Sequence, residues 1–492
     1  MTARLLNPAS AVIALVSGGT LIACGLGMLV CAGVGAIGDG RAIAALALPG
    51  AATLALGAAL VIAARRAPDA VAIRPAVGFG AVTLAWLFAA IVGAVPLLAA
   101  GTFSSLIDAY FEAMSGFTTT GATLLGEIEP EPDGILMWRQ VMQWLGGIGI
   151  VVLVVAVAPV SMLGMQRAFY AETSGITAER LTPRIIDTAK ILAGIYIALT
   201  VACGIGYAIT GMGGFDAVLH SLSTVATAGY SPKTASIGHF DSVGIELVAI
   251  AFMVAGGVNF AFYWRAIRGR PLMPPLAEVG IYLAILAVAI GVVTVSIVLS
   301  DDAGGIADSL RVSAFSVVTV ATTTGFVTAD FDAFNDFSRI LLLVLMVIGA
   351  CAGSTAGGLK VIRAFLLAKS GGQEVRRQLE PRMVQVLRLG GRTFSEETRR
   401  AVFSYFLVYV LVLVTGILAL AASGLDPVTA ISGGVSNLNL IGPALGDVGA
   451  HESYEAFSPF ARLVGATLML IGRLEIFTVV AVLVAVFRVA RG

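Results

Sequence analysis

The chain has 492 residues, of which 58% are hydrophobic and only 12% charged, and its formal net charge is zero. Ordinary soluble domains carry about 25% charged residues, so this composition excludes water as the main solvent. Several uncharged runs, such as 191–210, 279–299 and 402–422, reach the roughly 20 residues that an α-helix needs to cross a bilayer. The sequence therefore predicts an all-α polytopic membrane protein.

Side chains suited to bond chemistry are scarce. The three histidines, His220, His239 and His451, are far apart, and none lies in an HExxH motif. The four cysteines lie inside apolar runs, where they suit packing better than disulfide bonding. We predict neither an enzyme nor a bound cofactor. An intramembrane enzyme or scaffold stays the rival from another class, and it would require nucleophiles, bases or metal ligands converging inside the spans.

Ten hydrophobic spans follow in chain order. They lie near 11–34, 42–64, 76–100, 137–163, 187–211, 244–264, 279–299, 338–370, 402–423 and 460–487. The first is interpreted as a retained span, because it has no clear cleavage site and further spans follow at once. Most Lys and Arg fall between alternate spans, which predicts cytoplasmic N- and C-termini. The basic inner loop 360–400 either sets this topology or contacts anionic lipid or a partner subunit.

A second, shorter helical stretch precedes a glycine in each outer loop of the later spans. Gly121, Gly229, Gly325 and Gly442 recur about every hundred residues, which indicates four internal repeats of span, short pore helix and span. Two spans per repeat return the chain to its starting side, so the repeats are parallel and can surround a pseudo-fourfold pore. The first two spans form an additional N-terminal hairpin.

These repeats define the predicted domains. They are the N-terminal hairpin 1–74, pore repeat 1 at 75–186, pore repeat 2 at 187–276, pore repeat 3 with a gating loop and a cytoplasmic segment at 277–400, and pore repeat 4 at 401–492.

The polar residues beside these glycines point to a cation filter. Re-entrant backbone is tolerated at membrane depth only inside protein or beside water, and the C-terminal ends of the pore helices favour a dehydrated cation. Glycine permits the positive φ of the turn. Rings of carbonyls, helped by threonine hydroxyls, replace the hydration shell of a large monovalent ion, which suits potassium better than magnesium. The predicted potassium-binding residues are Thr119, Thr120, Gly121, Thr227, Ala228, Gly229, Thr323, Thr324, Gly325, Leu440, Ile441 and Gly442.

A single glycine after hydroxyl residues is a common helix cap, and a filter is indicated by the recurrence of a glycine turn in all four repeats. The segments SGFTTTGAT, STVATAGYS, VATTTGF and NLIGPALG resemble the four pore loops of the Trk/Ktr/HKT potassium transporter superfamily. Further matches are WLGGIGI, GGVNF, GSTAGGLK and GRLEIF, one after each pore loop. The N-terminal hairpin resembles the TrkH branch, and the likeness extends over nearly the whole chain.

The resemblance implies potassium uptake through a channel-like pore in a bacterial inner membrane. It implies a homodimer, a cytosolic nucleotide-binding regulatory subunit with Rossmann-type domains, and no nucleic-acid partner. Glycine at all four matching positions implies a preference for potassium. Ala228 and Leu440 depart from the family pattern, which implies a looser selectivity than in a typical member. A sodium-permeable or proton-coupled cation symporter of the same family is the alternative.

A glycine-rich interruption divides the eighth span. Each helical glycine costs about 1 kcal/mol relative to alanine, so we expect a broken helix below the filter. By resemblance this segment is a gate, with Gly349, Gly353, Gly357, Gly358 and Lys360 as its gating residues. Close packing of helices through small residues is the alternative interpretation.

Arg473 lies near the middle of the last span. A charge at this depth costs about 3 kcal/mol, so we expect its side chain to face the pore or a partner group. Its match to a family arginine implies a gating role, as a positive charge that resists cation leakage. A buried ion pair with another repeat is the alternative.

Overall fold

The computed structural model describes residues 7–66, 75–157, 185–272, 275–300, 305–381, 386–480 and 482. Almost all of its regular structure is helical. The helices are α1 (Pro8–Ile37), α2 (Ile43–Arg65), α3 (Pro75–Ala99), α4 (Leu106–Thr118), α5 (Asp133–Val157), α7 (Ile185–Ile209), α8 (Gly214–Val225), α9 (Val243–Gly256), α10 (Phe260–Ile267), α11 (Pro275–Leu299), α12 (Ile306–Ala321), α13 (Asp336–Ile348), α14 (Val361–Leu379), α15 (Glu396–Ala422), α16 (Pro427–Asn439) and α17 (Pro459–Arg473). Two short strands, β1 (Leu387–Leu389) and β2 (Arg392–Phe394), form an antiparallel hairpin.

The long helices have the length and surface of membrane spans. Six described helices are long and apolar enough to cross a bilayer, or seven if the bent pair α9 and α10 counts as one span. Large apolar side chains remain exposed along α1, α2, α7, α11 and α15. A surface of this kind suits lipid and not water. The fold is that of an all-α polytopic membrane protein, as the composition predicted.

Three of the ten predicted spans are broken. The expected break in the eighth span is present, between the end of α13 and the start of α14. The sixth span bends by 91° between α9 and α10, and the tenth is interrupted by a turn at 474–476 before helix resumes at 477; neither break was predicted. Hydropathy does not distinguish a straight apolar helix from a bent one, which explains both errors. Residues 158–163 of the fourth predicted span, and 481 and 483–487 of the tenth, lie outside the described residues.

The four short helices α4, α8, α12 and α16 each pack between the two helices that flank them in sequence. Each repeat also contacts the next repeat in the chain. The second long helix of one repeat packs against the short helix of its neighbour, in the pairs α5 with α8, α9 with α12, α13 with α16, and α17 with α4. The last pair joins repeat 4 to repeat 1, so the repeats form a closed ring.

Local sequence explains where the short helices begin and end. Ser105 and Asp426 cap α4 and α16 by accepting hydrogen bonds from backbone amides in the first turn. Asp108, Asp216 and Asp308 lie in the first turns of α4, α8 and α12, where a negative charge suits the helix dipole. These caps and charges stabilise the N-terminal ends of the short helices.

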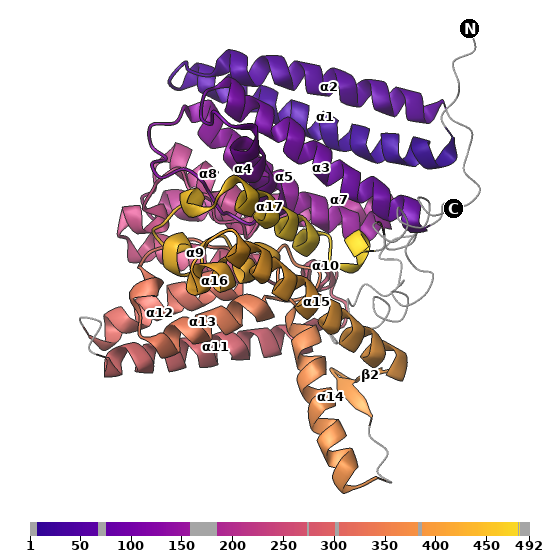
Figure 1. The fold of residues 1–492 in the computed structure, drawn as a ribbon, viewed down its shortest axis with the longest axis vertical. Helices are drawn as coiled ribbons and strands as arrows, with labels where there is room; N and C mark the ends of the chain where they lie inside the picture. The colour runs from indigo at the N-terminus through magenta and orange to yellow at the C-terminus, as the bar shows by residue number, and fades with distance from the viewer. Residues whose placement is uncertain are drawn as a thin grey trace.

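The third repeat continues outside the ring. Figure 1 shows α14 leaving the helical body, with β2 beside it. The first turns of α14 bury Ile362 and Leu366 against Leu387, Phe394 and Val402. The second half of the eighth predicted span is therefore not a straight continuation of α13.

The N-terminal hairpin is held together by very close helix packing. Figure 1 shows α1 and α2 side by side along one flank of the molecule, and α1 also contacts α3 and α5. A Cβ added to Gly25 would lie 2.7 Å from the Leu54 amide nitrogen and 2.8 Å from the Gly50 carbonyl oxygen. The two backbones can approach this closely only because Gly25 has no side chain.

We predict that Gly25→Ala destabilises the hairpin by roughly 1–3 kcal/mol, because the new methyl group has no space against the α2 backbone. Gly33→Ala is the matched control, since a Cβ at Gly33 meets no atom within 4 Å. The control should be neutral or slightly stabilising through helix propensity. Thermal unfolding in detergent measures both. Equal shifts of the two unfolding temperatures would contradict the packing account.

Candidate functional site

The chain after each short helix has the same unusual backbone in all four repeats. The first and third residues of each predicted filter triplet have positive φ. These residues are Thr119 (59°) and Gly121 (82°), Thr227 (50°) and Gly229 (83°), Thr323 (55°) and Gly325 (81°), and Leu440 (64°) and Gly442 (96°). Positive φ at three threonines and one leucine is strained, since the Cβ of an L-residue disfavours it. Its recurrence at four equivalent positions indicates that the surrounding structure enforces it.

The four glycines lie on one ring. A Cβ added to Gly121 would clash with the carbonyl of Ala228, and one on Gly229 would clash with the carbonyl of Thr324. In the same way a Cβ on Gly325 would meet the Ile441 carbonyl. One on Gly442 would lie 2.7 Å from the Thr120 carbonyl oxygen, which closes the circle. Each glycine therefore lies against the middle residue of the next repeat, and all four positions exclude a side chain.

Backbone hydrogen bonds attach each predicted filter triplet, which we also call a filter strand, to the short helix before it. The amide of each middle residue donates to the carbonyl five residues earlier. These bonds are Thr120 to Ser115 (2.9 Å), Ala228 to Ser223 (3.1 Å), Thr324 to Thr319 (2.8 Å) and Ile441 to Ser436 (3.1 Å). The amides therefore point back to the helices, and carbonyl oxygens remain for the centre of the ring.

Four of the five threonine hydroxyls in the predicted filter have hydrogen-bond partners. Thr120 and Thr324 hydrogen-bond to the hydroxyls of Thr118 (2.8 Å) and Thr322 (2.7 Å), which lie within their own repeats. Thr227 donates to Thr355 (3.1 Å), and the Thr323 hydroxyl accepts the Gly357 amide (2.7 Å). Among the described residues, Thr119 alone of the five predicted hydroxyl ligands has no hydrogen-bond partner. In this conformation backbone carbonyls are the main oxygen atoms available at the ring.

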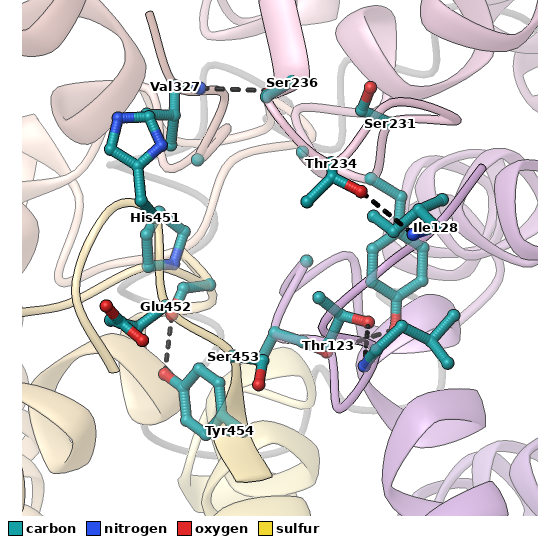
Figure 2. Close-up of a pocket in the computed structure, with 18 of the residues that line it drawn as sticks. Thr123, Ile128, Ser231, Thr234, Ser236, Val327, His451, Glu452, Ser453 and Tyr454 are labelled. Carbon is teal, nitrogen blue, oxygen red and sulfur yellow. Dashed lines mark hydrogen bonds between the residues drawn. The ribbon is translucent and has the colours of Figure 1, made fainter. Parts of the chain in front are cut away.

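A cavity of about 270 Å³ opens on one side of the ring, and we call it the vestibule. All four ring glycines line it, and Figure 2 shows segments of all four repeats around a central opening. Hydrogen bonds join each neighbouring pair of repeats, and those between repeats 1 and 2, 2 and 3, and 4 and 1 lie at the rim of the vestibule. The hydrogen bonds between repeats are Ile128 amide to Thr234 hydroxyl (2.9 Å), Val327 amide to Ser236 hydroxyl (3.2 Å), Gly446 amide to Asp332 carboxylate (3.0 Å) and Tyr454 amide to Thr123 carbonyl (2.8 Å).

One rim contact carries a charge. The Thr234 amide donates to the Glu129 carboxylate at 2.9 Å, and the Thr234 hydroxyl donates to it as well. Partial burial by itself would raise the pKa of the Glu129 carboxyl, but these hydrogen bonds outweigh burial and lower that pKa. Glu129 therefore stays ionised at neutral pH and keeps repeats 1 and 2 together at the rim.

The glycine-rich segment 349–360, between α13 and α14, lies on the other side of the ring from the vestibule. Gly349, Gly353, Gly358 and Lys360 have positive φ. The Thr355 hydroxyl donates to the carbonyls of Val225 (3.1 Å) and Gly256 (3.2 Å) in repeat 2.

The same segment also touches the inner ends of the filter strands. The Gly357 amide reaches the Thr323 hydroxyl, and a Cβ on Gly357 would clash with the Asn439 carbonyl of repeat 4. The Lys360 ammonium group donates to the Ala356 carbonyl within the segment. The predicted gating residues are thus gathered directly beneath the ring.

Arg473 completes this inner layer. Its side chain is 3% exposed, and it donates to the carbonyls of Thr355 (2.9 Å) and Gly146 (2.7 Å). Within the described part of the chain it has no ion-pair partner, so the alternative of a buried ion pair is not observed. Glu475 pairs instead with Arg363 at 2.5 Å. Arg473 therefore places a positive charge between repeat 1 and the glycine-rich segment.

The sequence interpretation missed the polar groups behind the ring. Glu112 and Arg139 form an ion pair at 2.9 Å with both side chains fully buried. Arg139 also lies over the Tyr230 ring, 4.2 Å from its centroid. The Gln143 amide group donates to the Ala228 carbonyl at 2.7 Å. Charged and amide residues within predicted membrane segments were a signal available in the sequence, because such residues are rare and face the protein interior.

We predict that Glu112→Gln costs roughly 3–5 kcal/mol, because it leaves the Arg139 guanidinium buried without its counter-ion. Asp108→Asn is the matched control on the same helix, since Asp108 pairs with Arg462 at a partly exposed site. Its cost should stay within about 1 kcal/mol. Thermal inactivation of the purified protein compares the two. A Glu112→Gln variant as stable as the control would refute a structural role for the buried pair.

Taken together, a closed ring of oxygen-bearing backbone, an open vestibule and apolar outer faces define a membrane protein built to pass small cations. The comparisons agree with that class. The family model described as "Cation transport protein", TrkH, matches residues 43–271 and 276–488. The chain is 41% identical to the Trk system potassium uptake protein TrkH of Halomonas elongata, over 83% of this chain and 85% of that protein. It is 37% identical to the TrkH of Escherichia coli strain K12, with the same shares covered.

A solved structure shares the fold. The crystal structure of the potassium transporter TrkH from Vibrio parahaemolyticus matches with a TM-score of 0.86 and 34% identity, over 96% of this chain and 97% of that chain. The chain belongs to the TrkH family of cation transport proteins. These relatives confirm the prediction of a transport protein and not an enzyme.

Proposed function

We propose that this chain takes up potassium across a cell membrane. The names of its relatives support the ion, since the TrkH proteins of Halomonas elongata and Escherichia coli are potassium uptake proteins. The observation that carries the proposal is the ring itself. Four glycines, one per repeat, lie in cyclic contact with carbonyls at the closed end of an open vestibule.

The proposed selectivity filter consists of the twelve residues predicted from the sequence, acting mainly through backbone carbonyls. Such carbonyls replace water around an ion that dehydrates easily, which favours K⁺ over Na⁺. The pore helices add the negative ends of their dipoles. Ala228 and Leu440 contribute no side-chain hydroxyl, so the two repeats that contain them offer fewer oxygen atoms than repeats 1 and 3.

The proposed gate is the segment 349–360 together with Arg473. In this proposal an ion leaving the filter is obstructed by Gly349, Gly353, Gly357, Gly358 and Lys360, and Arg473 adds a repelling charge. Conduction requires that this segment move aside. The glycines suit such a movement, because they adopt a wide range of backbone angles.

The setting of the protein is part of the proposal. We propose a homodimer in a bacterial inner membrane, with both termini cytoplasmic and the domain boundaries 1–74, 75–186, 187–276, 277–400 and 401–492. A cytosolic subunit with Rossmann-type nucleotide-binding domains regulates the gate from the inner face, where α14 and the β1–β2 hairpin project. Uptake is channel-like and driven by the membrane potential, which supplies about 2.3 kcal/mol per charge per 100 mV.

We expect wild-type protein to restore growth of potassium-uptake-deficient cells at low potassium and Gly121→Ser to fail, because the new side chain meets the Ala228 carbonyl. Gly101→Ser is the matched control: Gly101 also has positive φ, at 79°, but a Cβ there meets no atom within 4 Å. Loss of growth with both variants would attribute the defect to backbone strain in general and contradict a filter at Gly121.

Currents decide between the proposed pore and its alternative. The reversal potential of the wild-type current should change by about 59 mV for each tenfold change in the potassium gradient. It should not change with the sodium or proton gradient. A reversal potential displaced by a sodium or proton gradient would favour the symporter.

Arg473→Ala should raise basal K⁺ flux into liposomes several-fold in the absence of any regulator. The variant removes the inner positive charge and also the two hydrogen bonds through which Arg473 links Thr355 of the proposed gate to Gly146 of repeat 1. Arg462→Ala is the control, since Arg462 lies at the opposite end of α17 and pairs with Asp108. Unchanged flux in Arg473→Ala, with the protein folded, would count against a leak barrier at this position.

A further inference from the structure

The four filter strands have similar backbone angles, but their carbonyl oxygens differ in the hydrogen bonds that they accept. In the part of the chain that the structure describes, only two of the twelve filter carbonyls accept a hydrogen bond, those of Ala228 and Gly442. The glycine level of the ring is therefore uneven. The carbonyls of Gly121, Gly229 and Gly325 accept none, and that of Gly442 accepts two.

Both donors to Gly442 are buried hydroxyls. Tyr454 donates at 2.6 Å and Ser436 at 2.8 Å, so both lone pairs of this oxygen are engaged. Ser436 lies in the last turn of α16, behind the filter strand. The Gly442 carbonyl is consequently tied by hydrogen bonds to its own pore helix and to Tyr454.

The other repeats provide an internal comparison. Ser115, Ser223 and Thr319 occupy the position equivalent to Ser436, six residues before each ring glycine. None of them donates to its glycine carbonyl, and the Ser223 hydroxyl donates to Gln143 at 2.7 Å. The hydroxyl at this position is shared, but its use on the ring is particular to repeat 4.

The two tyrosines of the vestibule differ in the same way. The Tyr230 hydroxyl donates to the carbonyls of Glu112 (2.9 Å) and Ala122 (3.2 Å), which are not filter residues. The Tyr454 hydroxyl reaches a ring carbonyl, and Tyr454 lines the vestibule beside it (Figure 2). Tyr454 is thus the vestibule tyrosine that acts directly on the ring.

We propose that the glycine level of the filter is a three-carbonyl ion site, and that Tyr454 is a positioning residue that keeps the fourth carbonyl away from the ion. This inference rests on the proposed function. Water from the vestibule occupies the fourth side of the site. An ion there is coordinated by Gly121, Gly229 and Gly325 and lies off centre, away from Gly442. A partly hydrated ion is held less tightly, which allows it to move on quickly.

The Ala228 carbonyl also accepts a hydrogen bond, at the middle level of the filter, and this makes repeats 2 and 4 differ from repeats 1 and 3. Ala228 lies in repeat 2, and repeat 2 is across the ring from repeat 4 in the cyclic order. Repeats 1 and 3 keep every filter carbonyl free and share the same Thr-Thr hydroxyl bond. The two repeats that depart from the Thr-Thr-Gly pattern are therefore the two in which a filter carbonyl accepts a hydrogen bond.

Anomalous diffraction from crystals of the full-length protein in Rb⁺ tests the proposal. In wild type we expect the Rb⁺ peak at the glycine level to be displaced toward Gly229. In the double variant Tyr454→Phe, Ser436→Ala, the Gly442 carbonyl has no donor, so the peak should move to the centre. The apparent KM for Rb⁺ uptake should then fall roughly threefold to tenfold, the effect of gaining one hydrogen-bond-strength contact, while maximal flux does not rise.

Tyr230→Phe is the control, because it removes an equally buried hydroxyl that does not bond the ring; its Rb⁺ position and KM should match wild type. A wild-type peak equidistant from all four glycine carbonyls, or a double variant with unchanged peak and KM, would overturn the three-carbonyl site. If the double variant does not fold, the wild-type peak position alone decides. Absence of any Rb⁺ peak in the ring, together with absence of uptake by wild type, would instead refute the proposed function.

Discussion

The structure depends on one constraint: within a membrane, every backbone amide and carbonyl needs a partner that lipid cannot supply. Helices meet this need internally, but the four filter strands are not helical. Their middle amides bond back to carbonyls in the last turn of each pore helix, and adjacent strands enclose one another. The carbonyls are the groups left over. Because the four segments leave most of these carbonyls around one axis, an ion that can shed its water is the partner in the proposed function.

The same constraint explains the segment beneath the ring. Residues 349–360 are also non-helical, and their hydrogen bonds reach several repeats, among them Gly256 of repeat 2, Thr323 of the predicted filter, Glu278 of α11 and Arg473 of repeat 4. The segment therefore cannot shift without exposing groups on several repeats at once. Movement of this kind has few stable positions, which suits a switch with distinct closed and open states.

The sequence was sufficient for the architecture because its signals are periodic. Glycines about a hundred residues apart, each after a short helix with hydroxyl residues, predicted four repeats of span, short helix and span. The roles of the threonine hydroxyls were not predictable, since Thr227 and Thr323 bond to a segment that only the fold brings near. Gly256 and Gly257 look like ordinary small residues in an apolar run, so the bend between α9 and α10 was missed. Gln143 and Tyr454 were missed because they donate hydrogen bonds to backbone carbonyls. Every residue has such a carbonyl, so the sequence gives no sign of which one is bonded.

The contact between α17 and α4 joins the two ends of the ring, and the Tyr454 amide seals it by bonding the Thr123 carbonyl. These partners are separated by more than half of the polypeptide. During synthesis the first three repeats are threaded into the bilayer long before the last one leaves the ribosome, and contacts so distant in sequence form late. During that interval the polar residues that face the centre of the incomplete ring are not yet covered by repeat 4. The nascent protein must therefore be sheltered from lipid at this seam until its final hundred residues arrive.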